Sequence, residues 1–171
     1  VRALAANPRA AEDEYRILQS VHAAGIKTPA PLLLDVSGEL FPTPPLVIEF
    51  VIGPPEYAPT DPVAFGRQIA AELAKLHTMP LSGDLALLPR QAQRLAQRFT
   101  TLPAELDHSL DEGKIRALIE PVWPRLLAAG SALLHGDFWP GNLLWHNGEL
   151  AAIVAWEDAE IGNPLADFAI A

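Results

Sequence analysis

The chain has 171 residues, enough for one domain or for part of a larger one, and its 50% hydrophobic and 19% charged residues are typical of a globular protein. Twelve basic and 21 acidic residues give a net charge of −9, which argues against nucleic acid as a partner. There is no cysteine and no apolar run near the roughly 18 residues of a membrane span, so we expect no disulfide framework, no membrane partner and a cytoplasmic location. The acidic balance suits a cationic small-molecule substrate, and equally suits simple solubility.

The first third of the chain predicts one helix followed by two strands. Apolar residues at spacings of three and four indicate a helix over residues 10–24, which Gly25 ends. Residues 32–36 and 46–51 read as strands that can pair antiparallel, and residues 53–55 (Gly-Pro-Pro) read as a linker.

The rest of the chain predicts mostly helices. Asp61 followed by Pro62 is a helix start, and residues 90–99 and 112–127 read as further helices, the last kinked or split by two prolines. One apolar face of the first of these helices is formed by Phe65, Ile69, Leu73 and Leu76.

A hairpin and a final helix complete the prediction. Residues 142–145 and 150–154 read as strands around the Asn147–Gly148 turn, and residues 164–171 begin a helix. Strands followed by helices, without βαβ alternation, predict an α+β fold.

The most informative segment is the polar turn that runs from His135 to Asn142, between apolar stretches. Asp137 and Asn142 lie five residues apart in it. Phosphoryl transfer needs one carboxylate to orient the acceptor hydroxyl and oxygen ligands for Mg²⁺. Asp137 suits the first task and Asn142 the second.

This turn and the segments downstream of it resemble the aminoglycoside phosphotransferase and choline kinase family. The resemblance is carried by His-Gly-Asp-(four residues)-Asn at 135–142, Ile-Val-Ala-Trp-Glu-Asp-Ala at 153–159, Gly-Asn-Pro at 162–164 and Asp-Phe-Ala at 167–169. It implies a protein-kinase-like, two-lobed fold, with a partial N-terminal lobe and hinge over residues 1–53 and a partial helical C-terminal lobe over residues 54–171. It also implies ATP and Mg²⁺ as cofactors and a small molecule with a hydroxyl group as substrate.

The resemblance implies roles for four residues of the turn and its surroundings. Asp137 is the catalytic base, and His135 shapes the loop through its backbone and ring. Asn142 is a ligand of Mg²⁺. Asp167 braces the loop from below.

It also implies a nucleotide site built from the first part of the chain. Glu14 is the helix glutamate that pairs with a phosphate-binding basic residue, and Arg2 falls about where that residue is expected. The backbone C=O of Glu49 and N–H of Val51 would bind the adenine edge.

The chain departs from the family pattern at Ala155, where the family has an Asp that bridges Mg²⁺ and the nucleotide phosphates. Alanine offers no oxygen, so Glu157 or Asp158 would have to substitute, and strand alternation predicts Glu157 on the same side as Ala155. The chain is then a natural pseudoenzyme, an inactivated variant, or an enzyme that uses a neighbouring acid. A second departure is extent: the family's glycine-rich strands before Val1 and its acceptor-binding helices after Ala171 fall outside the sequence.

Two other functions remain open on the sequence. A non-catalytic, kinase-like nucleotide-binding or regulatory domain is favoured by Ala155. A metal-dependent hydrolase would use His135 and Asp137. Packing roles are the plain alternative for His77 and for Trp139, Trp145 and Trp156.

Overall fold

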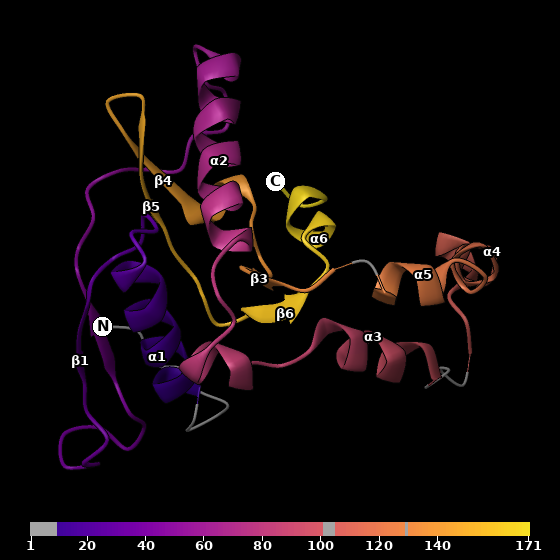
Figure 1. Ribbon diagram of the computed structural model, residues 1–171, viewed down its shortest axis with the longest axis horizontal. Helices are drawn as coiled ribbons and strands as arrows, with labels where there is room; N and C mark the ends of the chain where they lie inside the picture. The colour runs from indigo at the N-terminus through magenta and orange to yellow at the C-terminus, as the bar shows by residue number, and fades with distance from the viewer. Residues whose placement is uncertain (1–9, 101–104, 129) are drawn as a thin grey trace.

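A computed structural model of the protein describes residues 10–100, 105–128 and 130–171 (Figure 1). The helices are α1 (Ala10–Ala23), α2 (Pro62–His77), α3 (Gln91–Thr100), α4 (Glu112–Ile119), α5 (Trp123–Ala128) and α6 (Leu165–Phe168). The strands are β1 (Pro31–Leu34), β2 (Leu46–Ile48), β3 (Ala132–Leu134), β4 (Leu143–His146), β5 (Glu149–Ile153) and β6 (Glu160–Gly162). The described strands form antiparallel pairs, β1 with β2, β3 with β6 and β4 with β5, so the predicted α+β class is confirmed.

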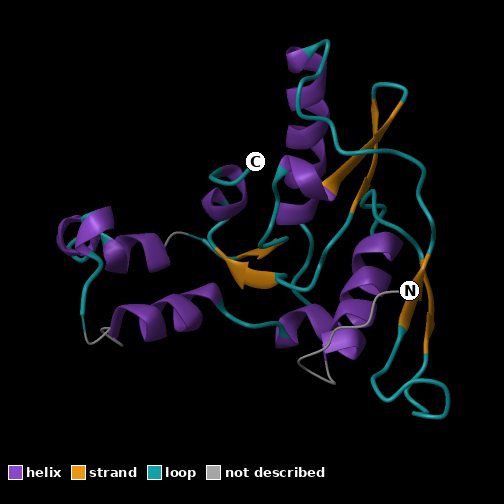
Figure 2. Ribbon diagram, turned by 180° about the vertical axis from the view of Figure 1, so that it is seen from behind, coloured by secondary structure: helices purple, strands orange, loops and turns teal. Residues whose placement is uncertain are grey.

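The first part of the chain is α1 packed beside the β1–β2 pair, as Figure 2 shows from behind. The predicted antiparallel pairing is confirmed, but β2 ends at Ile48 and does not reach residue 51. The reason is that β1 begins at Pro31, which pairs with Ile48, so no strand lies opposite the residues after Ile48. Phe50 is accordingly 87% exposed.

Helix α2 begins where the sequence predicts. The side chain of Asp61 accepts hydrogen bonds from the backbone N–H groups of Val63 and Ala64, and Pro62 occupies the first turn. These contacts satisfy amides that a helix start leaves without partners. Leu73 and Leu76 on the predicted apolar face are fully buried.

The core lies between α1, α2 and the β4–β5 hairpin. Trp156 and Phe138 are its largest fully buried side chains, and they come from the segments on either side of the hairpin. The hairpin turns at Asn147 and Gly148, both with positive φ, as the predicted turn requires. The core therefore holds the polar loop of residues 135–142 against a rigid base.

The β3–β6 pair was not predicted, and each of its strands has only three residues. All six residues are buried, with Leu133 opposite Ile161. This pair fixes the segment that enters the polar loop.

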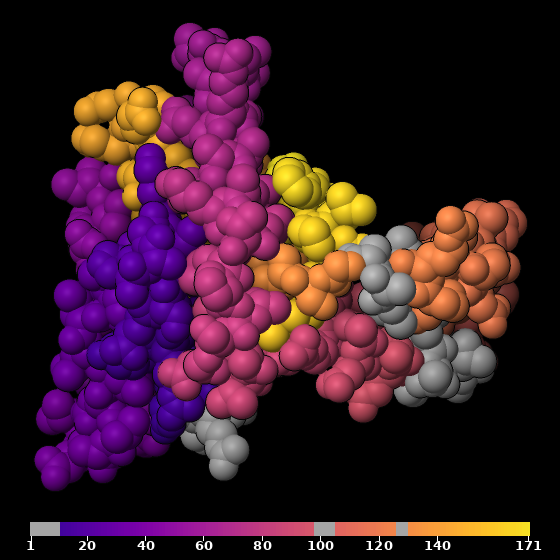
Figure 3. All heavy atoms as spheres, viewed as in Figure 1, coloured from indigo at the N-terminus to yellow at the C-terminus, as the bar shows by residue number. Residues whose placement is uncertain are grey.

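Helices α3, α4 and α5 project to one side of the core, as a space-filling view shows (Figure 3). The predicted helix over residues 112–127 is split at Pro121, since α4 ends at Ile119 and α5 starts at Trp123. The final helix α6 ends at Phe168 and is shorter than predicted. In the described ranges, every helix is too short or too polar to cross a membrane.

Candidate active site

The polar loop joins two strand pairs. Strand β3 leads into His135, a 3₁₀ turn covers Pro140–Asn142, and β4 starts at Leu143. The N–H of Val154, at the end of the hairpin, donates to the C=O of Asn142 at 2.9 Å. Both ends of the loop are thus held by backbone hydrogen bonds.

Asp167 lies beneath the loop with its carboxylate fully buried. One oxygen accepts the N–H of Gly136 at 3.1 Å, and the other accepts the N–H of His135 at 3.1 Å. The second oxygen also lies 2.9 Å from Nε2 of His77, at the end of α2. A buried carboxylate is tolerated only where hydrogen-bond partners replace the water that it loses. These contacts supply such partners and tie Asp167 to the start of the loop.

The ring of His135 is fully buried and makes a defined pair of hydrogen bonds. Nε2 lies 3.0 Å from the C=O of Val154, and the N–H of Asp137 lies 3.3 Å from Nδ1. Only the neutral ring with its proton on Nε2 satisfies both, because Nδ1 must accept while Nε2 donates. Burial lowers the pKa of His135 below its usual 6.5, against the opposing effect of the Asp167 carboxylate. Because the ring is buried and both of its nitrogens are engaged by the backbone, His135 leaves no nitrogen for a metal.

The lowered pKa of His135 predicts a loss of stability in mild acid. The unfolded chain takes up a proton on this ring near pH 6.5 and the native chain does not, so stability is fully present above that pH and falls below it. We measure the free energy of unfolding in urea between about pH 5 and 6.5. We expect His135→Gln to reduce the dependence of this free energy on pH by up to about 1.4 kcal/mol per pH unit. Equal slopes for the two proteins would contradict this assignment.

Gly136 is required by the path of the loop. Its φ is +85°, and an added Cβ would lie 2.1 Å from the backbone oxygen of Asp158. We expect Gly136→Ala to destabilise the fold by about 2–4 kcal/mol, combining backbone strain with overpacking. Gly148→Ala is the matched control, since its φ is +78° with open space around it, and it should cost about 1 kcal/mol in chemical denaturation. Equal costs for the two variants would show that the close approach is unimportant.

Asp137 and Asn142 converge, as the loop hypothesis requires. Nδ2 of Asn142 donates to Oδ2 of Asp137 at 2.8 Å and to the C=O of Asp137 at 2.8 Å. The amide nitrogen is therefore committed to Asp137. Among the described residues, the amide oxygen of Asn142 and the second carboxylate oxygen of Asp137 have no hydrogen-bond partner.

Ala155 comes after β5 in an unusual backbone conformation. Its φ is +67°, in the left-handed region that residues other than Gly, Asn and Asp seldom adopt. The hydrogen bond between Val154 and Asn142 places Ala155 next to the Asn142 end of the loop. Its side chain offers no oxygen there.

The strand alternation that was expected to place Glu157 on the same side as Ala155 does not extend to these residues. Strand β5 ends at Ile153, and the left-handed turn at Ala155 breaks the alternation. Glu157 and Asp158 are both exposed, and they line a cavity of about 340 Å³ with Arg94. In the part of the chain that the structure describes, no three His, Cys, Asp or Glu side chains gather into a metal-binding group.

The residues expected to bind the nucleotide belong to the first part of the chain. Glu14 is buried on α1 and lines a cavity of about 240 Å³ with Glu157. Among the described residues, the C=O of Glu49 and the N–H of Val51 have no backbone partner, whereas the N–H of Glu49 donates to Ala30 at 2.8 Å. Arg2 lies outside the described residues.

Sequence reasoning missed two contributors to the loop. The sequence favours a packing role for His77, whereas the structure places its ring 2.9 Å from the carboxylate of Asp167. The sequence holds one signal for the His77–Asp167 pair. His77 ends an apolar helix face, and Asp167 lies inside an apolar C-terminal segment. The C=O of Val154 gives no signal in the sequence.

Comparisons with known proteins agree with this loop and fold. The sequence matches the Phosphotransferase enzyme family (APH) over residues 2–171. Acyl-CoA dehydrogenase family member 10 of Mus musculus is 25% identical over 179 residues, which cover 94% of this chain and 16% of that protein. Viomycin phosphotransferase of Streptomyces vinaceus is 24% identical over 135 residues, covering 57% of this chain and 47% of that protein.

Among solved structures, aminoglycoside phosphotransferase APH(3'')-Id from Streptomyces rimosus, in complex with ADP and streptomycin, superimposes with a TM-score of 0.69 at 22% identity. The match covers 97% of this chain and 67% of that one. This likeness shows the fold, which is protein-kinase-like as predicted. The chain spans less than half the length of the two sequence relatives. Because the family match runs from residue 2 to residue 171, the chain belongs to the phosphotransferase enzyme family.

Proposed function

We propose that this protein is a small-molecule kinase that moves the γ-phosphoryl group of ATP to a hydroxyl of a small substrate. A cationic substrate would suit the acidic surface. The observation that carries the proposal is the Asp137–Asn142 hydrogen bond in a loop braced by Asp167. Phosphoryl transfer needs a fixed carboxylate to orient the acceptor hydroxyl and oxygen ligands for Mg²⁺, and this loop offers the carboxylate of Asp137 and the amide oxygen of Asn142.

In this proposal Asp137 accepts the proton of the acceptor hydroxyl. Asn142 occupies Oδ2 of Asp137, which leaves Oδ1 to receive the hydroxyl. The carboxylate of Asp167 accepts the N–H groups of His135 and Gly136, and Nδ1 of His135 accepts the N–H of Asp137, so the backbone leading into Asp137 is held in place. Holding the nucleophile in line raises its effective concentration at the phosphorus atom.

The residues present fit Mg²⁺ only in part. The amide oxygen of Asn142 can serve as one ligand, but Ala155 supplies none where the family resemblance expects a carboxylate. Mg²⁺ commonly takes one or two carboxylates together with substrate phosphates and neutralises charge on them. Glu157 and Asp158 remain candidate substitutes, although their cavity also holds Arg94, which lies 2.6 Å from Glu160.

The nucleotide would lie against the first part of the chain. Glu49 C=O and Val51 N–H would bind the adenine edge, and Glu14 with Arg2 would lie toward the phosphates. The ADP bound in the aminoglycoside phosphotransferase structure from Streptomyces rimosus supports this placement of the nucleotide. A lobe boundary near residue 53 and a cytoplasmic location, where ATP is plentiful, belong to the same proposal.

The second candidate is a catalytically impaired nucleotide-binding or regulatory domain. The observation that favours it is Ala155, which lacks an oxygen and adopts a conformation better suited to Asp or Asn.

The experiment that tests the proposal uses the full-length natural protein. Thermal unfolding is measured with ATP, with and without Mg²⁺, and phosphoryl transfer is measured over a panel of aminoglycosides, amino alcohols, sugars and fructosamines. A kinase shows stabilisation by ATP that depends on Mg²⁺ together with turnover of one acceptor class. ATP binding that ignores Mg²⁺, without turnover, supports the impaired domain.

A further inference from the structure

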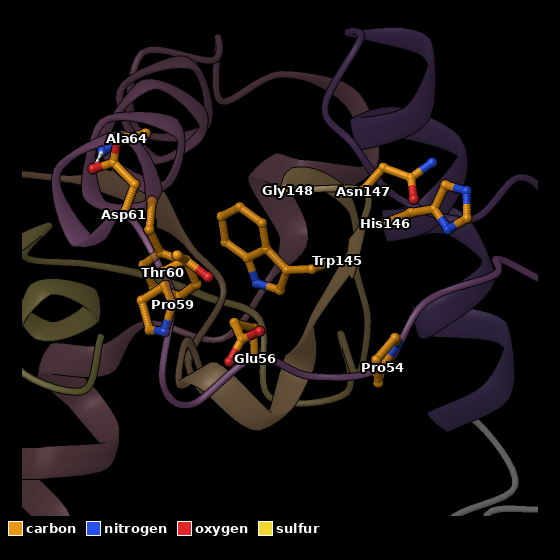
Figure 4. A pocket seen from close by; sticks show the side chains of 11 residues that line it. Pro54, Glu56, Pro59, Thr60, Asp61, Ala64, Trp145, His146, Asn147 and Gly148 are labelled. Atoms are coloured by element: carbon orange, nitrogen blue, oxygen red, sulfur yellow. Dashed lines mark hydrogen bonds between the residues drawn. The ribbon is translucent and has the colours of Figure 1, made fainter.

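A third cavity lies apart from the polar loop, at the tip of the β4–β5 hairpin (Figure 4). It has a volume of about 510 Å³, within the range of small-molecule sites. The linker after residue 53, the first turn of α2 and the hairpin turn form its walls. None of its lining residues belongs to the loop of residues 135–142.

The walls of this hairpin pocket are fixed by hydrogen bonds and stacking. The N–H of Trp145 donates to the C=O of Pro54 at 2.9 Å. The side-chain amide of Gln68 on α2 holds the hairpin turn, donating to Gly148 C=O at 2.9 Å and accepting from the N–H of Leu150 at 2.9 Å. The ring of Phe65 stacks on Trp145 with centroids 4.2 Å apart. The linker, the hairpin and α2 are therefore held in place around the pocket before any ligand arrives, which favours binding.

The indole of Trp145 carries a donor that the fold does not satisfy. The residue is 6% exposed, and its Nε1–H has no hydrogen-bond partner within the described chain. By contrast, the fully buried Trp156 donates from Nε1 to the C=O of Ile153 at 3.0 Å. Buried polar groups are nearly always paired. Figure 4 shows the Trp145 ring among the residues that line the pocket. Its Nε1 is covered from solvent, so a ligand oxygen completes the missing bond by displacing the groups that cover it.

Two carboxylates on the same wall give the pocket a negative charge. Asp61 uses Oδ1 for two amides of α2, and Glu56 uses Oε1 for the N–H of Ala58 at 2.8 Å. For each carboxylate, the described residues supply no partner for the second oxygen. Figure 4 shows Glu56 beside the indole and Asp61 farther along the wall. With a net charge of −9 on the chain, this wall attracts cations.

We propose that the hairpin pocket binds a small cationic molecule, an amine or guanidinium, whose carbonyl or hydroxyl oxygen accepts the Nε1–H of Trp145. Its positive group faces Glu56 and Asp61. This site is independent of phosphoryl transfer, because it uses none of the residues assigned to that reaction.

The test follows the indole N–H signal of Trp145 by nuclear magnetic resonance in the full-length natural protein, with Trp145→Phe to identify the signal. The probe is N-acetyl-arginine amide, which carries one guanidinium and two carbonyl oxygens. Its neutral near-isostere N-acetyl-citrulline amide is the control ligand. We expect a saturable shift of the Trp145 signal with the first and at least about tenfold weaker binding of the second, since hydrogen bonds to charged groups are the stronger ones.

Matched variants separate the site from general charge. Glu56→Gln should weaken binding of the probe by about tenfold. Glu149→Gln makes the same change on an exposed residue of the hairpin outside the pocket lining and should leave binding unaltered. No saturable shift, equal binding of the two ligands, equal effects of the two variants, or a Trp145 signal already protected by another part of the full-length chain would each overturn the proposal.

Discussion

Replacing Asp137 with Asn is expected to lower the rate of phosphoryl transfer by about 10²–10⁴-fold, the usual contribution of a positioned general base. An asparagine at this position can still accept the hydrogen bond from Asn142 through its oxygen. Its amide nitrogen would then face the acceptor hydroxyl, where it donates and cannot take up a proton. The measurement is turnover of the best acceptor from the substrate panel, with ATP and Mg²⁺.

The control for this variant is Asp111→Asn, which makes the same chemical change on a 63% exposed side chain at the start of α4. Asp111 has a φ of +52°, a conformation that Asn also accepts. We expect unaltered turnover in the control and unaltered unfolding midpoints in both variants. Full activity of Asp137→Asn would remove Asp137 from the reaction.

Replacing Ala155 with Asp is expected to raise Mg²⁺-dependent turnover by about 10²-fold or more, because a metal ion supplies several kcal/mol of transition-state stabilisation. The backbone favours the change, since Asp tolerates the left-handed conformation at φ +67° better than Ala does. The fold should therefore keep or gain stability. Turnover against Mg²⁺ concentration measures the effect.

Ala155→Asn separates charge from backbone strain. It relieves the strain equally and brings an amide oxygen, but it carries no negative charge, so its gain should be much smaller. If Glu157 or Asp158 already serves the metal, Ala155→Asp brings little gain, and Glu157→Gln or Asp158→Asn lowers turnover instead. No gain from Ala155→Asp combined with no loss from Asp137→Asn would end the kinase hypothesis.

The strongest local signals in the sequence predicted the fold well. The Asp61–Pro62 helix start, the Asn147–Gly148 hairpin and the prolines that split the helix over residues 112–127 each act through the local chain, so their outcome is independent of distant contacts. The β3–β6 pair was missed because three-residue strands are too short to show alternation. Their strand geometry depends on contacts between segments far apart in sequence.

The candidate site was only partly predictable. The spacing of Asp137 and Asn142 implied a shared turn, and their side chains are 2.8 Å apart. The left-handed backbone at Ala155 was not foreseeable, because alanine carries no preference for it. It turned the chain away from the regular strand on which the expected position of Glu157 depended. The unpaired indole of Trp145 is likewise a property of packing and leaves no trace in the residue order.

The buried Asp167 has a consequence for how the protein matures on the ribosome. Its partners lie 90 residues earlier at His77 and 32 residues earlier at His135. Because synthesis runs from the N-terminus, the nascent chain already carries Asp137 and Asn142 well before the carboxylate that anchors their loop emerges. Contacts over such separations form late. A polypeptide that stops before residue 167 therefore contains Asp137 and Asn142 but lacks the carboxylate that anchors the start of their loop.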